Sequence, residues 1–445
     1  MRAIANICLV ALLVQASSGA DLESLYGKQR WAELHDGLAN SRGSDLYRGA
    51  VAVVFHENSR RAEKLLRSTI RTLPASDDAY QAYEWLSHKF LYEGRYHSFV
   101  AVMEARWAAF PGKAEQKQER AAVAGFRGLP DQVTESVRPS TVPHEQKSIF
   151  IPLSVNHSAA TYFFDTGAWI SCISESEAKR VGLRFTGVAG LADTMTSKAG
   201  YRTAVADELV VGGVSVKHVS FAVFPDNGEP WSLLPVGRRG LLGIPIILAF
   251  QTLRWEPAGS MRIGEKPSAL DVRKANLIFD DDHLAVAVSI QGRKALAAVD
   301  TGAETSDFYR ELAVQFPSVV ETGEKGSTEI RGVGGAEAYE SVTLPELTLD
   351  VGGRQTIVRP AHVLMNRGVR SYVGNLGMDV FHQGAAFRLD FRAMTLHMIS
   401  GNTAVGGTGR VTCKNKTVKD TASGSTTVFD PVSTNNSAIA STLVQ

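Results

Sequence analysis

The sequence predicts two similar all-β lobes in one chain, preceded by an α-helical domain. The tetrapeptide Asp-Thr-Gly-Ala occurs twice, at 165–168 and 300–303, and each copy follows a short apolar run. Short apolar runs bounded by turn residues are typical of β-strands, whereas residues 21–130 place their apolar side chains at helical spacing. A strand that ends in such a tetrapeptide can hold a carboxylate at a tight turn.

The first twenty residues have the pattern of a secretory signal peptide. Arg2 supplies a positive charge, residues 4–14 are mostly apolar, and residues 18–20 offer small side chains for cleavage. A membrane anchor is the alternative, but the apolar run is short for a bilayer, and no later stretch is long and apolar enough to span one. We therefore expect residues 1–20 to be a signal peptide, the mature protein to be secreted or periplasmic, and no membrane attachment after cleavage.

The composition is that of a soluble globular protein with two or three domains. The chain has 445 residues, 44% of them hydrophobic and 21% charged, and its net charge is +1. Such a balanced charge gives no reason to expect nucleic acid or a membrane surface as a partner. After signal cleavage only Cys172 and Cys413 remain, so at most one bridge could form. Cys172 follows the first tetrapeptide; a nucleophilic role is possible, but a small buried side chain is the favoured interpretation.

Residues 21–130 are expected to form a helical domain. Residues 46–73 and 79–110 are rich in Ala, Leu, Glu, Arg and aromatic residues at helical spacing. Residues 85–87, Phe90, residues 94–96 and Pro111 together resemble a tetratricopeptide repeat. An earlier stretch ending at Pro74 is a weaker match, since the two prolines are further apart than the usual period of about 34 residues. An unrelated helical bundle remains an equal alternative, and this region could contact a protein partner.

The remaining chain divides at stretches rich in proline, glycine and polar residues. Ser174 and Glu177 fit a capping box, which predicts a short helix after the first tetrapeptide. The tail has few apolar residues and is expected to be disordered. The expected segments are a linker at 131–147, lobe one at 148–263, a linker at 264–274, lobe two at 275–400 and the tail at 401–445.

The two lobes align at a constant offset, which indicates an internal duplication. At the offset that separates Asp165 from Asp300, residues 149–155 fall on residues 284–290, with a serine at the same place. Downstream, Gly243 of a Leu-Leu-Gly sequence follows the first aspartate, and Gly377 of an Asn-Leu-Gly sequence follows the second. These two separations differ by a single position. Each lobe therefore repeats one small domain.

Matched tetrapeptides predict a paired-carboxylate site. Like charges held close together cannot both ionise easily, so Asp165 and Asp300 would share one proton. The ionised member could take a proton from water, and the protonated member could donate to a substrate carbonyl. Two unrelated turns are the alternative, which the matched flanks disfavour. The expected supporting residues are threonines that fix the geometry and glycines that permit close backbone approach: Thr166, Gly167, Thr301 and Gly302.

This arrangement resembles the aspartic proteases, and Asp-Thr-Gly-Ala is similar to their retroviral-type, or retropepsin, branch. The likeness covers about residues 148–400 and includes both aspartate motifs, the helix after the first and the two Leu-Gly sequences. It implies an all-β bilobal acid-protease-like barrel pair with one active site between the lobes. Asn375 stands where that family has an apolar residue. The family also implies flap hairpins over the cleft, for which residues 199–201 and 332–335 are the candidates.

The sequence thus predicts an aspartic-type endopeptidase that acts on peptide or protein substrates without a cofactor. Asp165 and Asp300 would be catalytic. The alternative is a catalytically silent peptide-binding or scaffold protein on a protease fold, although binding alone gives no reason to hold two repelling carboxylates together. No metal site is expected, because the histidines are isolated and residues 280–282 lack the rest of a calcium-loop pattern. The glycines at 332–335 lack the lysine and the βαβ context of a phosphate loop.

Overall fold

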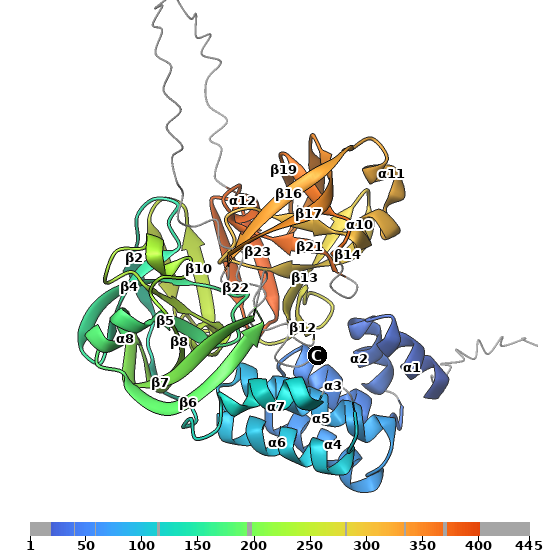
Figure 1. Cartoon of the computed structure of the whole chain (residues 1–445). Coiled ribbons are helices and arrows are strands. Elements are labelled where there is room, and N and C mark those ends of the chain that lie inside the picture. The colour runs from blue at the N-terminus through green and yellow to red at the C-terminus, as the bar shows by residue number, and fades with distance from the viewer. Residues whose placement is uncertain are drawn as a thin grey trace, which may run out of the picture.

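The computed structural model describes residues 19–400, except residues 40, 58, 114–115, 194–197, 281–282, 333–334 and 368–371. The predicted signal sequence up to residue 18 and the predicted disordered tail at 401–445 lie outside the described residues. Within them, the chain forms an N-terminal helical domain and two β-rich lobes (Figure 1). None of the helices in the described part is long and apolar enough to cross a membrane.

In the described residues, helices make up the N-terminal domain, as the helical spacing predicts; the tetratricopeptide assignment stays a prediction. Ser44 and Ser76 cap two of them, accepting hydrogen bonds from the backbone N–H groups three residues on. Trp85 packs edge-on against Trp31 at 5.8 Å between ring centroids. The helices are α1 (Gly19–Gly27), α2 (Trp31–Ala39), α3 (Asp45–Val54), α4 (Ser59–Thr72), α5 (Asp77–Tyr92), α6 (Tyr96–Ala109) and α7 (Gln116–Ala124).

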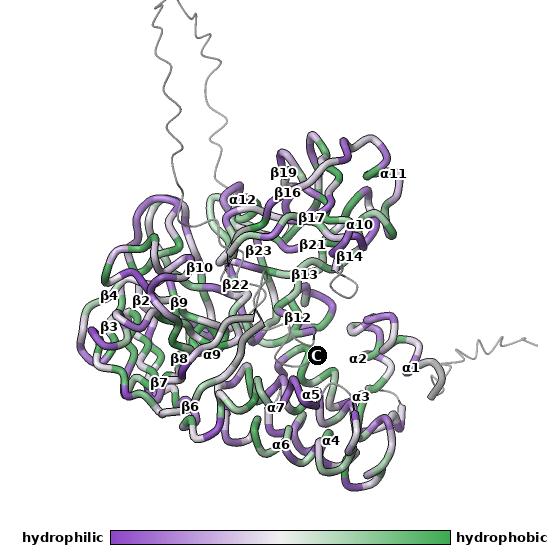
Figure 2. Tube along the Cα trace, in the orientation of Figure 1, coloured by the Kyte–Doolittle hydropathy of each residue, from purple (hydrophilic) through white to green (hydrophobic). Residues whose placement is uncertain are grey.

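Lobe one is a closed β-barrel. Its strands and helices are β3 (Phe150–Val155), β4 (Ser158–Phe164), β5 (Ser171–Ser174), α8 (Glu175–Arg180), β6 (Arg184–Asp193), β7 (Lys198–Val211), β8 (Val214–Phe224), η1 (Trp231–Leu233), β9 (Gly240–Leu242) and α9 (Ile244–Ala249). The ring runs β8-β5-β9-β4-β3-β7 and closes because β7 pairs with β8 as well as with β3. Figure 2 shows hydrophobic residues along β8 and β9. The predicted capping box is confirmed, since Ser174 Oγ accepts from Glu177 N at the start of α8.

Lobe two repeats this plan as a half-barrel. Its elements are β12 (Leu277–Asp280), β13 (His283–Ile290), β14 (Arg293–Val299), β15 (Asp307–Tyr309), α10 (Arg310–Gln315), α11 (Pro317–Val320), β16 (Glu324–Gly332), β17 (Gly335–Leu344), β18 (Leu347–Val351), β19 (Arg354–Val358), β20 (Ala361–Leu364), β21 (Tyr372–Leu376) and α12 (Met378–Phe381). The stretch that β7 covers as one strand is split here between β17 and β18, with Pro345 in the gap. Pro360 likewise separates β19 from β20. Proline has no N–H to donate to a ladder, which accounts for both breaks.

A five-stranded sheet joins the lobes. Its order is β2-β11-β10-β22-β23, in which β10 of lobe one pairs with β22 of lobe two. The strands are β2 (Ser140–Pro143), β10 (Thr252–Glu256), β11 (Ser260–Ile263), β22 (Ala386–Asp390) and β23 (Thr395–Ile399). The segment 131–147, expected to be a linker, instead supplies β2 to this sheet and β1 (Val133–Val137) to the edge of lobe one beside β8. Its β-branched residues, among them Val133, Val137 and Val142, suit strand edges.

An aromatic stack on the joining sheet gives a testable pH dependence. The His382 ring stacks on Trp255 at 5.0 Å between centroids. Burial, assisted by the charge of Lys147, lowers the pKa of His382 from 6.5 to about 4. Between these two pKa values the unfolded chain therefore binds more protons than the folded protein. The stabilisation that neutral His382 contributes is complete above about pH 6.5 and is lost as the pH falls toward 4. We expect the free energy of unfolding, measured by urea denaturation, to decline over that window.

The control for this prediction is His382→Phe, which keeps a ring against Trp255 but cannot take up a proton. Its free energy of unfolding should fall less steeply between about pH 6.5 and about pH 4 than that of the wild type. Equal slopes in the two proteins would show that His382 is not the group responsible.

The helical domain packs against both lobes. Tyr92, the last residue of α5, stacks on Trp169 of lobe one at 4.3 Å and on Phe279 of lobe two at 4.8 Å between ring centroids. Helix α7 contacts β6, and these elements lie side by side in Figure 1. The Gln132 side chain, beyond α7, donates to the carbonyl of Pro245 at 2.7 Å. The helices therefore contact residues close to the first tetrapeptide.

Candidate active site

Each tetrapeptide is held by a parallel strand pair at the centre of its lobe. Strand β4 runs parallel to β9 and β14 runs parallel to β21, and the aspartates follow β4 and β14 directly. The backbone N–H of Asp165 donates to Leu242 O at 2.9 Å, and that of Asp300 donates to Leu376 O at 3.0 Å. The Leu-Gly sequences recognised in both halves are therefore the strands that anchor the two aspartate turns.

Two serines, not singled out from the sequence, complete this anchoring. Ser171 Oγ accepts from Gly243 N at 3.1 Å, and Ser306 Oγ accepts from Gly377 N at 2.9 Å. Both hydroxyls are buried, so each satisfies a backbone group that water does not reach. The two serines are separated by the same offset as the two aspartates. Extending the alignment of the two halves past the tetrapeptides would have identified them.

The two threonines lock the halves together by reciprocal hydrogen bonds. Thr166 N donates to Thr301 Oγ1 at 3.1 Å, and Thr301 N donates to Thr166 Oγ1 at 3.0 Å. Each hydroxyl also donates across the lobe boundary, Thr166 Oγ1 to Val299 O at 2.7 Å and Thr301 Oγ1 to Phe164 O at 3.0 Å. Both side chains are buried. These four bonds hold the two aspartate turns in one arrangement, as expected for supporting residues.

Removing one of these hydroxyls should weaken the fold measurably. Thr166→Val keeps the shape of the side chain but leaves Thr301 N and Val299 O buried without this partner. Each unsatisfied buried group costs about 1–3 kcal/mol, so we expect a loss on the order of 2–4 kcal/mol in the free energy of unfolding. Denaturant unfolding measures this loss. Thr166→Ser, which retains the hydroxyl, should lose clearly less, and equal losses in the two variants would contradict this account of the threonine pair.

The carboxylates face each other across the lobe boundary. Asp165 Oδ1 accepts from Gly167 N at 2.8 Å, and Asp300 Oδ1 accepts from Gly302 N at 2.9 Å. A Cβ placed on Gly302 would lie 2.6 Å from each carboxylate oxygen of Asp165, and one on Gly167 would lie 3.0 Å from Asp300 Cγ. Each glycine thus makes room for the aspartate of the opposite lobe. The structure brings together all six residues singled out from the sequence.

Asp300 has an unusual electrostatic setting. Burial raises the pKa of its carboxyl, and hydrogen bonds from Asn375, from Asp165 and from the amides of Gly302 and Ala303 oppose the rise. Asn375 Nδ2 donates to Asp300 Oδ2 at 2.8 Å. The residue that departs from the family pattern therefore contacts the second aspartate directly. The hydrogen bond between the two aspartates requires that one of them carry a proton.

The other candidates from the sequence have separate outcomes. Burial raises the pKa of Cys172 well above its usual value, so it is a buried thiol and not an activated nucleophile. Cys413 lies outside the described residues. Among the residues that the structure describes, no cluster of histidine, cysteine, aspartate or glutamate could hold a metal ion.

Both candidate flap segments belong to long hairpins. Strands β6 and β7 pair as one hairpin, and residues 199–201 lie in β7 close to its turn. Strands β16 and β17 form the other, with Gly332 paired to Gly335 at its end. Tyr201 is buried against the helical domain, since a Cβ on Gly125 would lie 2.7 Å from its ring. The hairpin of lobe one thus contacts the N-terminal helices.

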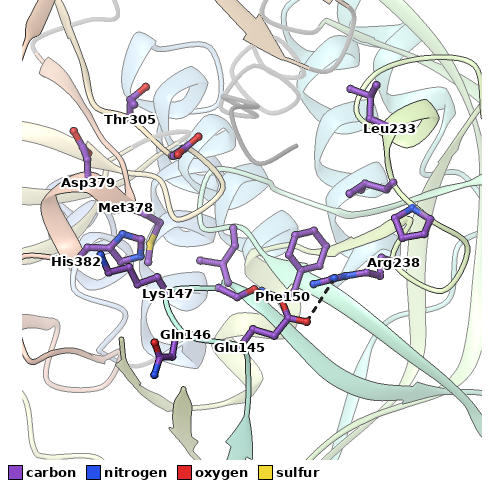
Figure 3. A pocket seen from close by; sticks show the side chains of 15 residues that line it. Glu145, Gln146, Lys147, Phe150, Leu233, Arg238, Thr305, Met378, Asp379 and His382 are labelled. Atoms are coloured by element: carbon purple, nitrogen blue, oxygen red, sulfur yellow. Dashed lines mark hydrogen bonds and ion pairs between the residues drawn. The ribbon is translucent and has the colours of Figure 1, made fainter. Parts of the chain in front are cut away.

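A cavity of about 590 Å³ opens between the lobes (Figure 3). The wall from lobe one includes residues 145–150 and Arg238, and the wall from lobe two includes Thr305, Asp379 and His382. Arg238 Nη1 lies 3.8 Å from Glu145 Oε1. Glu304 and Thr305 directly follow the second tetrapeptide. Asp165 and Asp300 do not line it and are fully buried. Access to the dyad in this arrangement therefore requires a movement of the surrounding segments.

The family comparison agrees with this architecture. A family model described as "Aspartyl protease" matches residues 151–246, which lie in lobe one. One solved structure that the chain resembles is a retropepsin-like aspartic protease from Rickettsia conorii, with 16% sequence identity and a TM-score of 0.20. The match covers 29% of this chain and 93% of the chain in that structure. No curated protein matches the chain. The paired lobes and the family match give an aspartic protease-like fold, bilobal and preceded by helices.

Proposed function

We propose that the protein is an aspartic-type endopeptidase whose two aspartates act as one site. The observation that carries the proposal is the dyad itself. Two fully buried carboxyl groups from different lobes adjoin each other, each packed against the glycine of the opposite motif, and reciprocal threonine bonds fix their positions. Leaving two acidic groups buried together is unfavourable unless they share a proton, and such a pair can take a proton from water while giving one to a carbonyl oxygen.

The chemistry balances with water and the dyad alone. The ionised aspartate takes a proton from water as the water oxygen bonds to the peptide carbonyl carbon, and the protonated aspartate gives its proton to the carbonyl oxygen. The resulting tetrahedral diol then loses the amine. The aspartate that protonated the carbonyl oxygen takes a proton back from one hydroxyl of the diol. The other aspartate gives the proton that it took from water to the departing nitrogen. No cofactor or metal enters this sequence of steps.

We propose an extended, unfolded peptide as substrate, which would lie between the lobes once the segments that cover the dyad have moved. The inter-lobe cavity has a wall from each lobe, which suits a chain lying between them. The helices pack on Trp169, four residues after Asp165, and on the hairpin that contains Tyr201, so they lie beside lobe one close to the dyad. We propose that this region also contacts protein substrates or partners, and that the protein acts outside the cytoplasm, as its N-terminal sequence suggests.

The test uses one protein mixture as substrate in two states, chemically unfolded and native. We expect the wild type to cleave the unfolded mixture, to leave the native one largely intact, and to lose all cleavage when both aspartates are replaced by asparagine. A wild type that binds peptides without cleaving them would favour the silent scaffold instead. Cleavage that persists in the double variant would rule out the dyad.

A further inference from the structure

We infer that Asn375 is a positioning residue that makes the dyad asymmetric, so that Asp300 is the ionised member and Asp165 the protonated one. The inference deepens the proposed function and rests on it for its catalytic meaning. The fold makes two positions equivalent, and the residues at these positions differ in polarity. Leu241 pairs with Phe163 in lobe one, and Asn375 pairs with Ala298 in lobe two. Phe163 and Ala298 each stand two positions before the aspartate of their lobe, so their partners occupy matching places.

The duplication would otherwise give the two aspartates similar surroundings. Each accepts from the glycine two residues ahead, and each follows a strand anchored by a Leu-Gly sequence. At the equivalent positions beside these turns, however, lobe one has an apolar side chain and lobe two has an amide. Both side chains are fully buried. An amide in such a place is costly unless it is hydrogen-bonded, and Asn375 Nδ2 donates to Asp300 Oδ2.

The donors on Asp300 favour its charged form. Oδ2 accepts from Asn375, and Oδ1 accepts from Gly302 N at 2.9 Å and from Ala303 N at 3.1 Å. Hydrogen bonds from N–H donors stabilise a carboxylate over the neutral acid. The remaining bond in the pair, between Asp165 and Asp300, then has Asp165 as its donor. In the hydrolysis described above, Asp300 would accept the proton of water and Asp165 would protonate the carbonyl oxygen.

The experiment replaces Asn375 by the residue of the equivalent position. Asn375→Leu removes the donor and keeps the branching and the number of non-hydrogen atoms of the side chain, so Asp300 should ionise less readily. We expect the acidic limb of the kcat/KM pH profile to move upward by about 1–2 pH units, the size that one hydrogen bond to a buried charge implies. Asn375→Ala, which cannot overfill the site, should shift the limb in the same direction. Leu241→Met, the matched change in lobe one, should leave the profile in place.

A second measurement does not need turnover. Carbon-13 NMR of carboxyl-labelled aspartate follows the titration of the dyad, assigned with Asp165→Asn and Asp300→Asn. Asn375→Leu should raise the pH at which the dyad ionises by the same amount. The variant could show this titration shift although the wild type cleaves no peptide. That result would support the role of Asn375 and contradict the proposed protease activity. Equal titrations and equal pH profiles in wild type and variant, or a rate loss that is the same at every pH, would overturn the inference.

Discussion

Replacing either aspartate alone should abolish peptide cleavage. In Asp165→Asn and in Asp300→Asn, one amide replaces a carboxyl of nearly the same shape, so the dyad loses either its proton donor or its proton acceptor. General acid and base groups each contribute about 10²–10⁴-fold to a rate, and here the two steps are coupled through one water, so we expect a loss of at least about 10³-fold in kcat for each variant. Peptide hydrolysis followed by mass spectrometry measures this loss.

The control for this prediction is the fold. Each variant keeps an oxygen that can accept from the glycine two residues ahead, and the threonine bonds between the lobes do not involve the aspartate side chains. The thermal midpoint should therefore stay near that of the wild type, or rise, since the substitution relieves the proximity of two acidic groups. If a folded variant retained more than about a tenth of wild-type activity, the mechanism would not need both aspartates.

The sequence was sufficient to predict the paired site because its information is local and duplicated. The tetrapeptides, the strands before them and the Leu-Gly strands recur at matched offsets, and the fold places each matched pair in equivalent surroundings. A polar residue that breaks such a match, Asn375, contacts the second aspartate. The matched motifs of the two lobes could therefore be predicted from the sequence, and the mismatch at Asn375 pointed to a residue that contacts the dyad.

The differences between the lobes and the docking of the helices could not be predicted in the same way. Whether strands close into a barrel depends on the continuity of β7 and on the breaks at Pro345 and Pro360, which alter pairing between segments distant in sequence. The strands in the expected linker owe their structure to neighbours, β8 and β11, that lie far along the chain. The contacts of Tyr92 with Trp169 and Phe279 join three domains, and no periodicity within one segment encodes them.

Adding one methyl group at Gly302 should lower activity strongly, although less than removing a carboxyl does. In Gly302→Ala, the new Cβ would lie 2.6 Å from both carboxylate oxygens of Asp165, a separation that real Cβ contacts do not show. Because the turn is fixed by the threonine bonds, the Asp165 side chain has to move. A displacement of about 1 Å in a catalytic group can cost about 10²-fold in rate, and we expect a loss of that order in kcat.

The geometry also ranks the matching substitution in the other lobe. In Gly167→Ala the nearest atom, Asp300 Cγ, would be 3.0 Å away, so a shift of a few tenths of an ångström suffices and the loss of activity should be clearly smaller. Gly326→Ala in β16 is the control, because a Cβ there meets nothing within 4 Å, and it should keep full activity. Measured under the same conditions, the three variants should rank in the order Gly302, Gly167, Gly326. Equal losses for Gly302→Ala and Gly167→Ala would contradict this geometry, in which Gly302 lies closer to the Asp165 carboxylate than Gly167 lies to the Asp300 carboxylate.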